Sequence, residues 1–153
     1  MAASDHLALD DQLCFALYAA QRAMTRAYAP LLEPLGVTYP QYLALLVLWE
    51  ADGVLVRELG DRLALDSGTL TPLLKRLEER GLVTRQRGTD DERVVRIHLT
   101  PAGKALRQEA RKVPIALACR AGFDPADKRA RAALAALRGE LRALAERLEE
   151  PAA

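Results

Sequence analysis

The stretch that decides the fold is "DSGTLTPLLKRLEERGLVTRQRGTDDERVVRIHLT", residues 66–100. It opens with Asp66 and Ser67, whose side chains are both of the kind that cap helix N-termini. The leucines that follow recur at helical spacing up to Gly81, a residue that favours the C-terminal end of a helix. We therefore predict a helix over residues 67–80, capped by one of these two polar residues.

A change of period follows this helix. Residues 82–84 and 94–99 are rich in β-formers, and the polar residues 88–92 connect them, so we predict a β-hairpin. The preceding segment "VLVRELGDRLAL", residues 54–65, indicates a second short helix, separated from the first only by a turn around Ala64 and Leu65. Two short helices with a tight turn, followed at once by a hairpin, predict a winged helix-turn-helix.

Two more helices are expected towards the N-terminus. Apolar periodicity covers residues 8–29, and Pro30 should end that helix. In the next helix, Thr38 is a candidate N-cap with Gln41 as its capping-box partner, and Gly53 marks the end.

Helices should also follow the hairpin. Thr100-Pro101 opens one that Pro114 should end or kink, and a last helix begins at Asp124-Pro125. This last helix carries leucines three and four residues apart, at Leu134, Leu137, Leu141, Leu144 and Leu148. The stripe fits packing on the chain's own core or a helix–helix contact in a dimer. We favour the dimer, because the N-terminal helix also has apolar residues on more than one face.

The fold class expected is mainly α-helical with a small β-hairpin wing, in a single domain of residues 1–153. Within it we assign residues 38–100 to the winged helix-turn-helix and residues 8–30 and 104–150 to dimerisation helices. Half of the residues are hydrophobic and 28% are charged, which is typical of a globular protein. With no apolar run of ~20 residues and no basic, signal-like start, we expect a cytoplasmic protein without a membrane span.

Charge is unevenly distributed along the chain. Residues 67–104 hold eight Lys and Arg against five Asp and Glu, whereas residues 1–66 hold four against nine. A basic helix-turn-helix predicts that the 67–80 helix enters the major groove of double-stranded DNA, with a homodimer on a pseudo-palindromic site. The candidate base-reading residues are Ser67, Thr69 and Thr71. The candidate phosphate-binding residues are Lys75 and Arg76. In the wing we expect Arg85, Arg87, Arg93 and Arg96 to reach DNA, with Asp91 orienting Arg93. The alternative is a solvated hairpin of mixed charge.

Two further stretches make the sequence more specific: "LDDQLCFALYAA", residues 9–20, and "VTYPQYLALLVLWE", residues 37–50. Together with the winged helix, the chain resembles the MarR family of transcription regulators, and in particular its organic hydroperoxide resistance branch. The resemblance covers roughly residues 8–150. It implies a homodimeric repressor that leaves DNA when an organic hydroperoxide oxidises its N-terminal cysteine, here Cys14. The two-cysteine type then forms a disulfide with a distant cysteine of the other subunit, for which Cys119 stands in the expected region.

The chemistry expected at Cys14 depends on the tyrosines. The reactive form of a cysteine is the thiolate, and an apolar surface opposes its formation, so a sensor needs hydrogen-bond donors to sulfur. Tyr18 lies one helical turn after Cys14, whereas Tyr28 lies about 21 Å further along the same helix. If two copies of this helix pack antiparallel, as the resemblance implies, Tyr28 and Tyr39 of one subunit reach Cys14 of the other. The alternative for both cysteines is a purely structural role.

Two other functions remain open from the sequence. A MarR-type regulator can bind a small aromatic molecule between its domains, and a thiol peroxidase could destroy hydroperoxides. The basic winged helix argues against a peroxidase, so we expect no enzyme activity. Two histidines and two cysteines are too few and too scattered for a zinc site, and we expect no cofactor and no metal.

Overall fold

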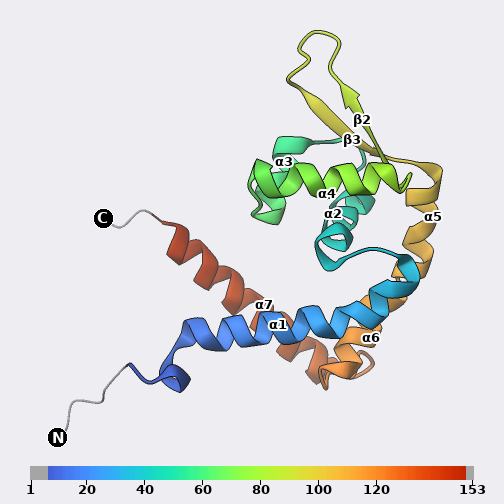
Figure 1. The fold of residues 1–153 in the computed structure, drawn as a ribbon. Coiled ribbons are helices and arrows are strands. Elements are labelled where there is room, and N and C mark those ends of the chain that lie inside the picture. Colours follow the sequence, from blue (N-terminus) through green and yellow to red (C-terminus); the bar gives the residue numbers. More distant parts are fainter. Residues whose placement is uncertain (1–6, 151–153) are drawn as a thin grey trace, which may run out of the picture. The chain divides into compact units, whose positions relative to one another are not determined.

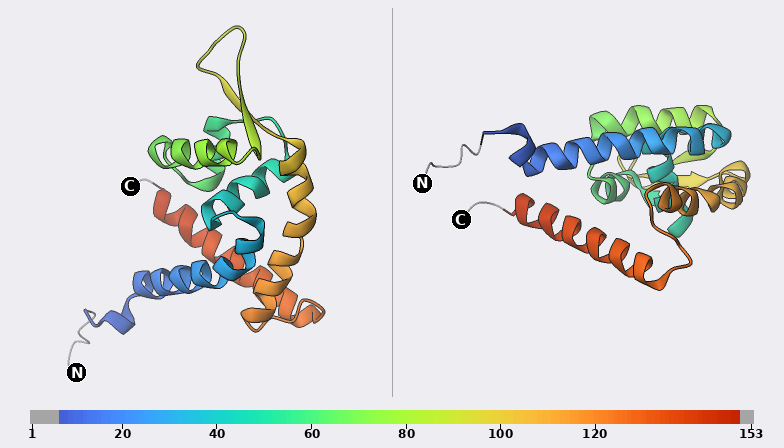
Figure 2. Two further views of the ribbon diagram at one scale, coloured as in Figure 1. Left: turned by 45° about the vertical axis from the view of Figure 1, so that its right-hand side comes forward. Right: turned by 90° about the horizontal axis from the view of Figure 1, so that it is seen from below.

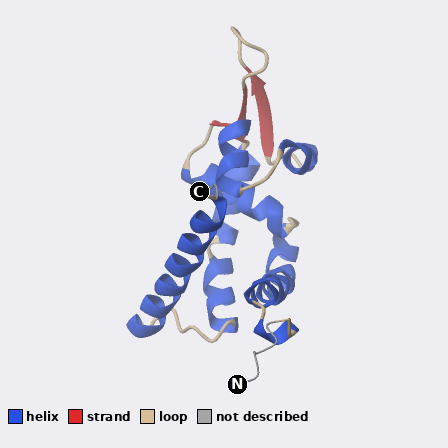
Figure 3. Ribbon diagram, turned by 90° about the vertical axis from the view of Figure 1, so that its left-hand side faces the viewer, coloured by secondary structure: helices blue, strands red, loops and turns tan. Residues whose placement is uncertain are grey.

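The computed structural model describes residues 7–150; the start of the acidic N-terminal stretch and the last three residues lie outside this range. The chain forms two compact units, the first ending at Val113 and the second beginning at Pro114. Among residues 7–150, helices dominate both units, and strands occur only in the wing and at its base (Figure 3). The expected class, mainly helical with a small hairpin, is confirmed.

The first unit begins with a 3₁₀ turn, η1 (Leu9–Asp11), and the long helix α1 (Leu13–Leu32), which a second 3₁₀ turn, η2 (Glu33–Leu35), joins to α2. The other helices are α2 (Tyr39–Glu50), α3 (Val56–Leu63), α4 (Ser67–Glu79), α5 (Pro101–Ala110), α6 (Lys112–Arg120) and α7 (Lys128–Glu149). The strands are β1 (Val54–Leu55), β2 (Val83–Arg87) and β3 (Val95–Leu99). They pair antiparallel in the order β1-β3-β2, so the hairpin gains a short third strand from the residues before α3.

Helix α2 lies at the centre of the hydrophobic core, where Tyr42, Leu45 and Leu48 are buried. Against it pack the leucines of α4 and the inward-facing residues of the sheet, which are Leu70, Leu73, Leu74, Leu77, Val83, Ile97 and Leu99. Burying this apolar surface fixes α4 on the body of the unit while the β2–β3 hairpin extends away from it (Figure 1). The core therefore positions both elements expected to meet DNA.

The turn of the helix-turn-helix is tight for local reasons. Ala64 ends α3 in the left-handed conformation, with φ 51°, and Asp66 caps α4 by accepting a hydrogen bond from the Thr69 backbone N–H at 2.8 Å. Gly60 lets α3 approach the turn, because a Cβ there would lie 3.1 Å from the Leu65 carbonyl oxygen. The predicted turn at residues 64 and 65 is confirmed, and Asp66 rather than Ser67 is the cap.

The prediction for the first helix was wrong at both ends. Helix α1 begins at Leu13, because residues 9–11 form a separate 3₁₀ turn, and it continues through Pro30 to Leu32 (Figure 2). Proline removes one backbone hydrogen bond and disfavours a helix interior. Here it lies only two residues from the helix end, and the complete burial of Leu32 holds the last turn in place.

The helices after the wing also differ from expectation. The break predicted at Pro114 falls at Arg111, between α5 and α6, so Pro114 lies in the first turn of α6. Helix α7 begins at Lys128 rather than at Asp124-Pro125. The reason is that Asp127 caps it, accepting from the backbone N–H groups of Arg129 and Ala130, while Asp124 closes the turn before it.

The leucine stripe of α7 lies on the surface of the second unit. Leu137, Leu141 and Leu148 are exposed, and Leu134 and Leu144 are half-buried. Among residues 7–150, no single helix is long and apolar enough to span a membrane; only the bent pair Leu13–Leu35 and Tyr39–Glu50 meets the length and composition criteria.

Candidate functional site

The sulfur of Cys14 lies in the first turn of α1. Because the helix begins at Leu13, Cys14 is its second residue, and its side chain is exposed and not in a disulfide. The N-cap residue Gln12 makes no side-chain cap to the helix and instead donates from its amide to the Ala8 carbonyl at 3.0 Å. The N-terminal end of a helix carries partial positive charge and attracts anions. The sequence prediction missed this placement, since it started the helix at residue 8.

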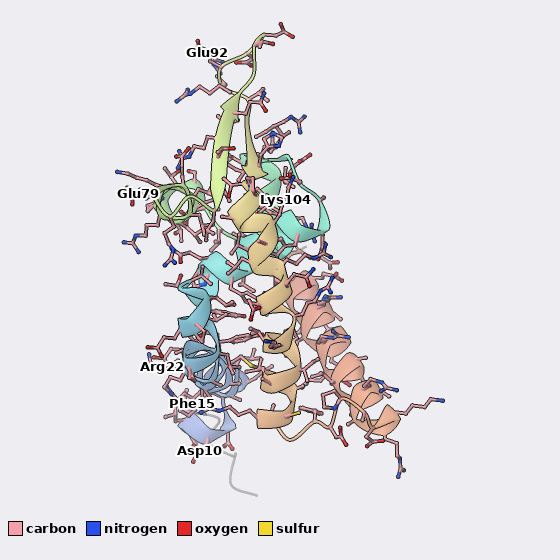
Figure 4. All side chains as sticks on the ribbon, turned by 90° about the vertical axis from the view of Figure 1, so that its right-hand side faces the viewer. Asp10, Phe15, Arg22, Glu79, Glu92 and Lys104 are labelled. Carbon is pink, nitrogen blue, oxygen red and sulfur yellow. The ribbon has the colours of Figure 1, made fainter. Side chains whose placement is uncertain are left out.

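Around Cys14, α1 presents an aromatic and a basic group. Phe15 and Tyr18 stack with their ring centroids 6.4 Å apart, and the Arg22 guanidinium donates a hydrogen bond to the Tyr18 hydroxyl at 3.2 Å. Arg22 also lies over the Tyr18 ring, 5.5 Å from its centroid. Phe15 and Arg22 follow one another along the helix, with Asp10 just before its start (Figure 4). Within the described chain, the Tyr18 hydroxyl is therefore joined to Arg22 rather than to Cys14.

A second aromatic cluster forms where the end of α1 meets the start of α2. The ring of Tyr28 lies 4.7 Å from that of Tyr39 and 5.7 Å from that of Tyr42, and Tyr42 in turn contacts Trp49 edge-on at 6.4 Å. Burial, and then the neighbouring phenols of Tyr39 and Tyr42, raise the pKa of Tyr28 to about 12. Burial raises the pKa of Tyr39 and of Tyr42 as well. All three phenols thus stay protonated near neutral pH and can donate hydrogen bonds.

Sequence reasoning did not include Tyr42 among the site residues. The sequence feature that could have identified Tyr42 is its position three residues after Tyr39 on the same helix. The structure brings Tyr28 and Tyr39 together but keeps them apart from Cys14 of the same chain. Cys14 and Tyr28 are fourteen residues apart on one unbroken helix, a distance of about 21 Å.

The second cysteine belongs to the second unit. Cys119 lies near the end of α6, is exposed, and is not in a disulfide. In the first unit, a cavity of about 750 Å³ opens beside the tyrosine cluster. Its walls come from the end of α1, the start of α2 and the end of α4, and include Thr25, Ala29, Tyr39, Arg76, Glu79 and Arg80.

On the candidate DNA-binding helix, the polar side chains lie on the surface opposite to the buried leucines. The exposed residues include all the predicted contacts on α4, which are Ser67, Thr69, Thr71, Lys75 and Arg76. Lys75 lies 3.9 Å from Glu79, one turn along the helix. Hydrogen bonds from Thr69, chiefly from its backbone N–H, lower the pKa of Asp66, which keeps this helix cap charged.

The wing arginines divide into two groups. Arg85 binds back onto α4, with its guanidinium 3.5 Å from the Glu78 carboxylate and 3.3 Å from the Thr71 carbonyl, and Arg96 donates to the Gly53 carbonyl at 2.9 Å. Arg85 and Arg96 therefore connect the base of the wing to the rest of the first unit. Arg87 and Arg93 are exposed closer to the tip, where Glu92 lies (Figure 4). Asp91 accepts a hydrogen bond from the backbone N–H of Arg93 at 2.9 Å, so it contacts Arg93 through the backbone and shapes the turn.

Comparison with known proteins identifies the family to which this chain belongs. The family model described as transcriptional regulator SarA/Rot matches residues 26–110. The organic hydroperoxide resistance transcriptional regulator of Bacillus subtilis (strain 168) is 56% identical over 110 residues, covering 72% of this chain and 75% of the relative. The chain belongs to the MarR family of winged-helix transcriptional regulators, of SarA/Rot type.

Solved structures of AbfR from Staphylococcus epidermidis are also similar to this MarR-family chain. Reduced AbfR bound to DNA matches with a TM-score of 0.76 and 35% identity, covering 96% of this chain and 99% of AbfR. Disulfide-formed AbfR matches with a TM-score of 0.63 and 36% identity, covering 94% and 93%. The family members are named as transcriptional regulators and not as enzymes, and this chain is accordingly a transcriptional regulator.

Proposed function

We propose that this chain is a cytoplasmic homodimeric repressor that binds a pseudo-palindromic site on double-stranded DNA and releases it when an organic hydroperoxide oxidises Cys14. The observation that carries the proposal is the placement of Cys14, exposed in the first turn of α1, in a chain 56% identical to an organic hydroperoxide regulator. The candidate recognition helix α4 and the wing supply the DNA-binding surface, and AbfR, which is similar in fold, binds DNA in its reduced form.

The oxidation step uses groups of this chain. The Cys14 thiolate attacks one oxygen of the hydroperoxide, the O–O bond breaks, and the departing alkoxide takes a proton to leave as an alcohol. Sulfur is oxidised to a sulfenic acid while the peroxide is reduced. Cys14 lies in the first turn of α1, and Tyr18 lies one turn further along the same helix. Arg22 fixes the Tyr18 phenol oxygen as an acceptor, because a guanidinium can only donate, and this leaves the phenol proton available to sulfur.

Dimerisation completes the sensor. The Tyr28–Tyr39 pair cannot reach Cys14 of its own chain, so we infer that it serves Cys14 of the second copy. Both proposed dimerisation segments, residues 8–30 and 104–150, carry exposed apolar side chains. These are Leu9, Leu13, Tyr18 and Met24 in the first segment and Ile115, Leu137, Leu141 and Leu148 in the second. Burying them between two copies would remove this apolar surface from water.

Cys119 is the proposed resolving cysteine. Its thiolate attacks the sulfenic sulfur of Cys14 in the other subunit, an S–S bond forms, and the sulfenic oxygen leaves as water after protonation. A disulfide needs Cα atoms within about 7 Å, so forming it constrains the helix that carries Cys119. The disulfide-formed structure of AbfR supports this route for a protein of the same fold.

A gel-shift experiment tests the proposal on the DNA upstream of the chain's own gene. The reduced wild-type protein should retard the DNA, and micromolar cumene hydroperoxide should release it. Cys14→Ser should stay bound, whereas Cys119→Ser should still be oxidised at Cys14 without forming a cross-linked dimer on non-reducing electrophoresis. Hydroperoxide-driven release by Cys14→Ser, equal to that of the wild type, would refute the proposed sensor.

A second candidate function has one observation in its favour. The cavity of about 750 Å³ beside Tyr39 is large enough for a small aromatic molecule and is bordered by Arg76 and Arg80. A regulator that used this cavity as its main input would release DNA with such a ligand and ignore organic hydroperoxide. The same gel shift, run with each class of compound, separates the two functions.

A further inference from the structure

One side chain joins the candidate recognition helix to the tyrosine cluster. Arg80, the C-cap residue that directly follows α4, donates a hydrogen bond from its guanidinium to the carbonyl oxygen of Gly36, in the turn between α1 and α2. The two residues are 44 positions apart in the sequence. In the described part of the chain, this side-chain hydrogen bond connects the end of α4 to the turn before α2.

The conformation of Gly36 leaves space for the Arg80 guanidinium against the backbone of the turn. Gly36 has φ 63°, a left-handed conformation that glycine adopts without strain. A Cβ at this position would lie 2.9 Å from the Arg80 Cζ and Nη1 atoms, so the absence of a side chain lets the guanidinium rest on the backbone. The contact therefore needs a glycine at position 36 for two separate reasons.

A conformational change in this turn would alter the position of Tyr39, because the turn leads directly into α2. Gly36 is followed by Val37 and by Thr38, which caps α2 through a complete capping box with Gln41. Tyr39 is the first residue of α2, and its ring lies 4.7 Å from that of Tyr28. Only two residues thus separate the carbonyl that Arg80 binds from one member of the tyrosine pair.

The cavity of about 750 Å³ lies at this junction, with the end of α1, Tyr39 and the end of α4 in its walls. Earlier in α4, Leu70, Leu73, Leu74 and Leu77 are buried in the core. Arg80 therefore links the end of α4 that borders the cavity to the turn that precedes α2.

We propose that Arg80 is a positioning residue that couples the DNA-bound position of α4 to the arrangement of Tyr28 and Tyr39. The oxidative part of this inference rests on the proposed function, in which the tyrosine pair serves Cys14 of the second copy. Coupling between two sites is reciprocal. DNA bound to α4 should therefore alter the tyrosine pair, and a changed tyrosine pair should alter the affinity for DNA.

The first test uses the reduced protein and needs no oxidation. Tyrosine rings are labelled with ¹³C, and their NMR signals are followed as duplex DNA from upstream of the chain's own gene is added. In the wild type, the signals of Tyr28 and Tyr39 should shift on binding. Arg80→Met should bind DNA with those shifts largely lost, and Arg80→Lys, which can still donate to the Gly36 carbonyl, should recover part of them.

A matched control shows whether the loss of the tyrosine shifts is specific to Arg80 or follows from the removal of any surface arginine. Arg62 also joins a helix of the DNA-binding region to α2, through a 2.6 Å ion pair with Glu50, and it does not contact the turn at Gly36. Arg62→Met should keep the wild-type shifts. Circular dichroism melting of each variant shows that it is folded, and Gly36→Ala, which displaces the guanidinium, should reproduce the effect of Arg80→Met.

The second test measures the ratio of DNA affinities between the reduced protein and protein oxidised at Cys14, with oxidation verified by mass. Arg80→Met should reduce this ratio by about 5-fold or more, the lower end of typical coupling between sites. A wild-type ratio in Arg80→Met, or unchanged tyrosine shifts in that variant, would overturn the role of Arg80. If the wild type itself shows no oxidation-dependent release, the proposed redox function fails, and the NMR result still decides the coupling.

Discussion

The two ends of α1 are chemically different although they belong to one helix. At the C-terminal end, Leu32 is buried and Tyr28 packs against Tyr39 and Tyr42, so residues of the same chain surround this end of the helix. At the N-terminal end, Leu13 is 61% exposed and Tyr18 is 56% exposed beside the free thiol of Cys14. Apolar groups are exposed at one end and buried at the other, and the proposed dimer would cover the exposed end.

The largest expected effect comes from truncating a leucine at each end of the helix. Leu32→Ala should lower the free energy of unfolding by about 2–5 kcal/mol, because it opens a cavity in the core. Leu13→Ala should change the stability of a single chain little and should instead raise the dimer dissociation constant. Denaturant unfolding and analytical ultracentrifugation measure the two quantities, and equal effects of both variants on unfolding would remove the contrast.

The next prediction concerns alkaline pH. Tyr28 has its pKa raised from 10.0 to about 12 in the folded chain, so the stability it contributes is complete below pH 10 and is lost as the pH rises towards 12. Tyr28→Phe should remove this part of the pH dependence. Phenolate absorbance near 295 nm, followed together with denaturant unfolding, checks it. A variant with an unchanged loss of stability between these pH values would show that the effect belongs to another group.

A smaller effect is expected at the junction after the buried end. Thr38→Val removes the side-chain acceptor of the α2 capping box and should cost about 1 kcal/mol in unfolding free energy. Because Tyr39 is the next residue, the variant should also loosen the Tyr28–Tyr39 contact. Thermal melting and tyrosine NMR measure the two consequences, and Thr89→Val, at an exposed position between β2 and β3, is a suitable control.

The smallest effect belongs to the exposed end. Arg22→Met removes the hydrogen bond to Tyr18, a contact between solvent-exposed side chains, and should change unfolding free energy by no more than about 0.5 kcal/mol. Its influence should appear instead in the rate at which Cys14 reacts with cumene hydroperoxide. A large loss of stability would mean that this end of α1 packs more firmly than its exposure indicates.

Local rules predicted the DNA-binding half of the chain well. The helix after Asp66, the turn at Ala64 and the hairpin all depend on caps, period and turn residues within a few positions of each other, and the structure has them. The two-residue strand β1 was not predicted, because only its pairing with Ile97 and Arg96, far along the chain, makes it a strand.

The candidate sensor was harder to predict in detail. The identity of Cys14 and of the tyrosines was available from the sequence, but the start of α1 depends on a 3₁₀ turn that periodicity does not reveal. The contact between Arg80 and Gly36 joins residues 44 positions apart and has no local signature. Arg85 and Arg96 were assigned to DNA from charge alone, whereas side-chain hydrogen bonds direct both towards the base of the wing.

Trp49 gives this protein a built-in optical reporter. It is the single tryptophan of the chain, and its indole N–H reaches from α2 to the Gly103 carbonyl of α5 at 2.9 Å. Indole emission depends on hydrogen bonding and on contact with water, so separation of α5 from α2 would shift the fluorescence spectrum without any added dye. Stopped-flow mixing with an oxidant would show whether these helices separate, and at what time relative to the proposed release of DNA, in the unmodified protein.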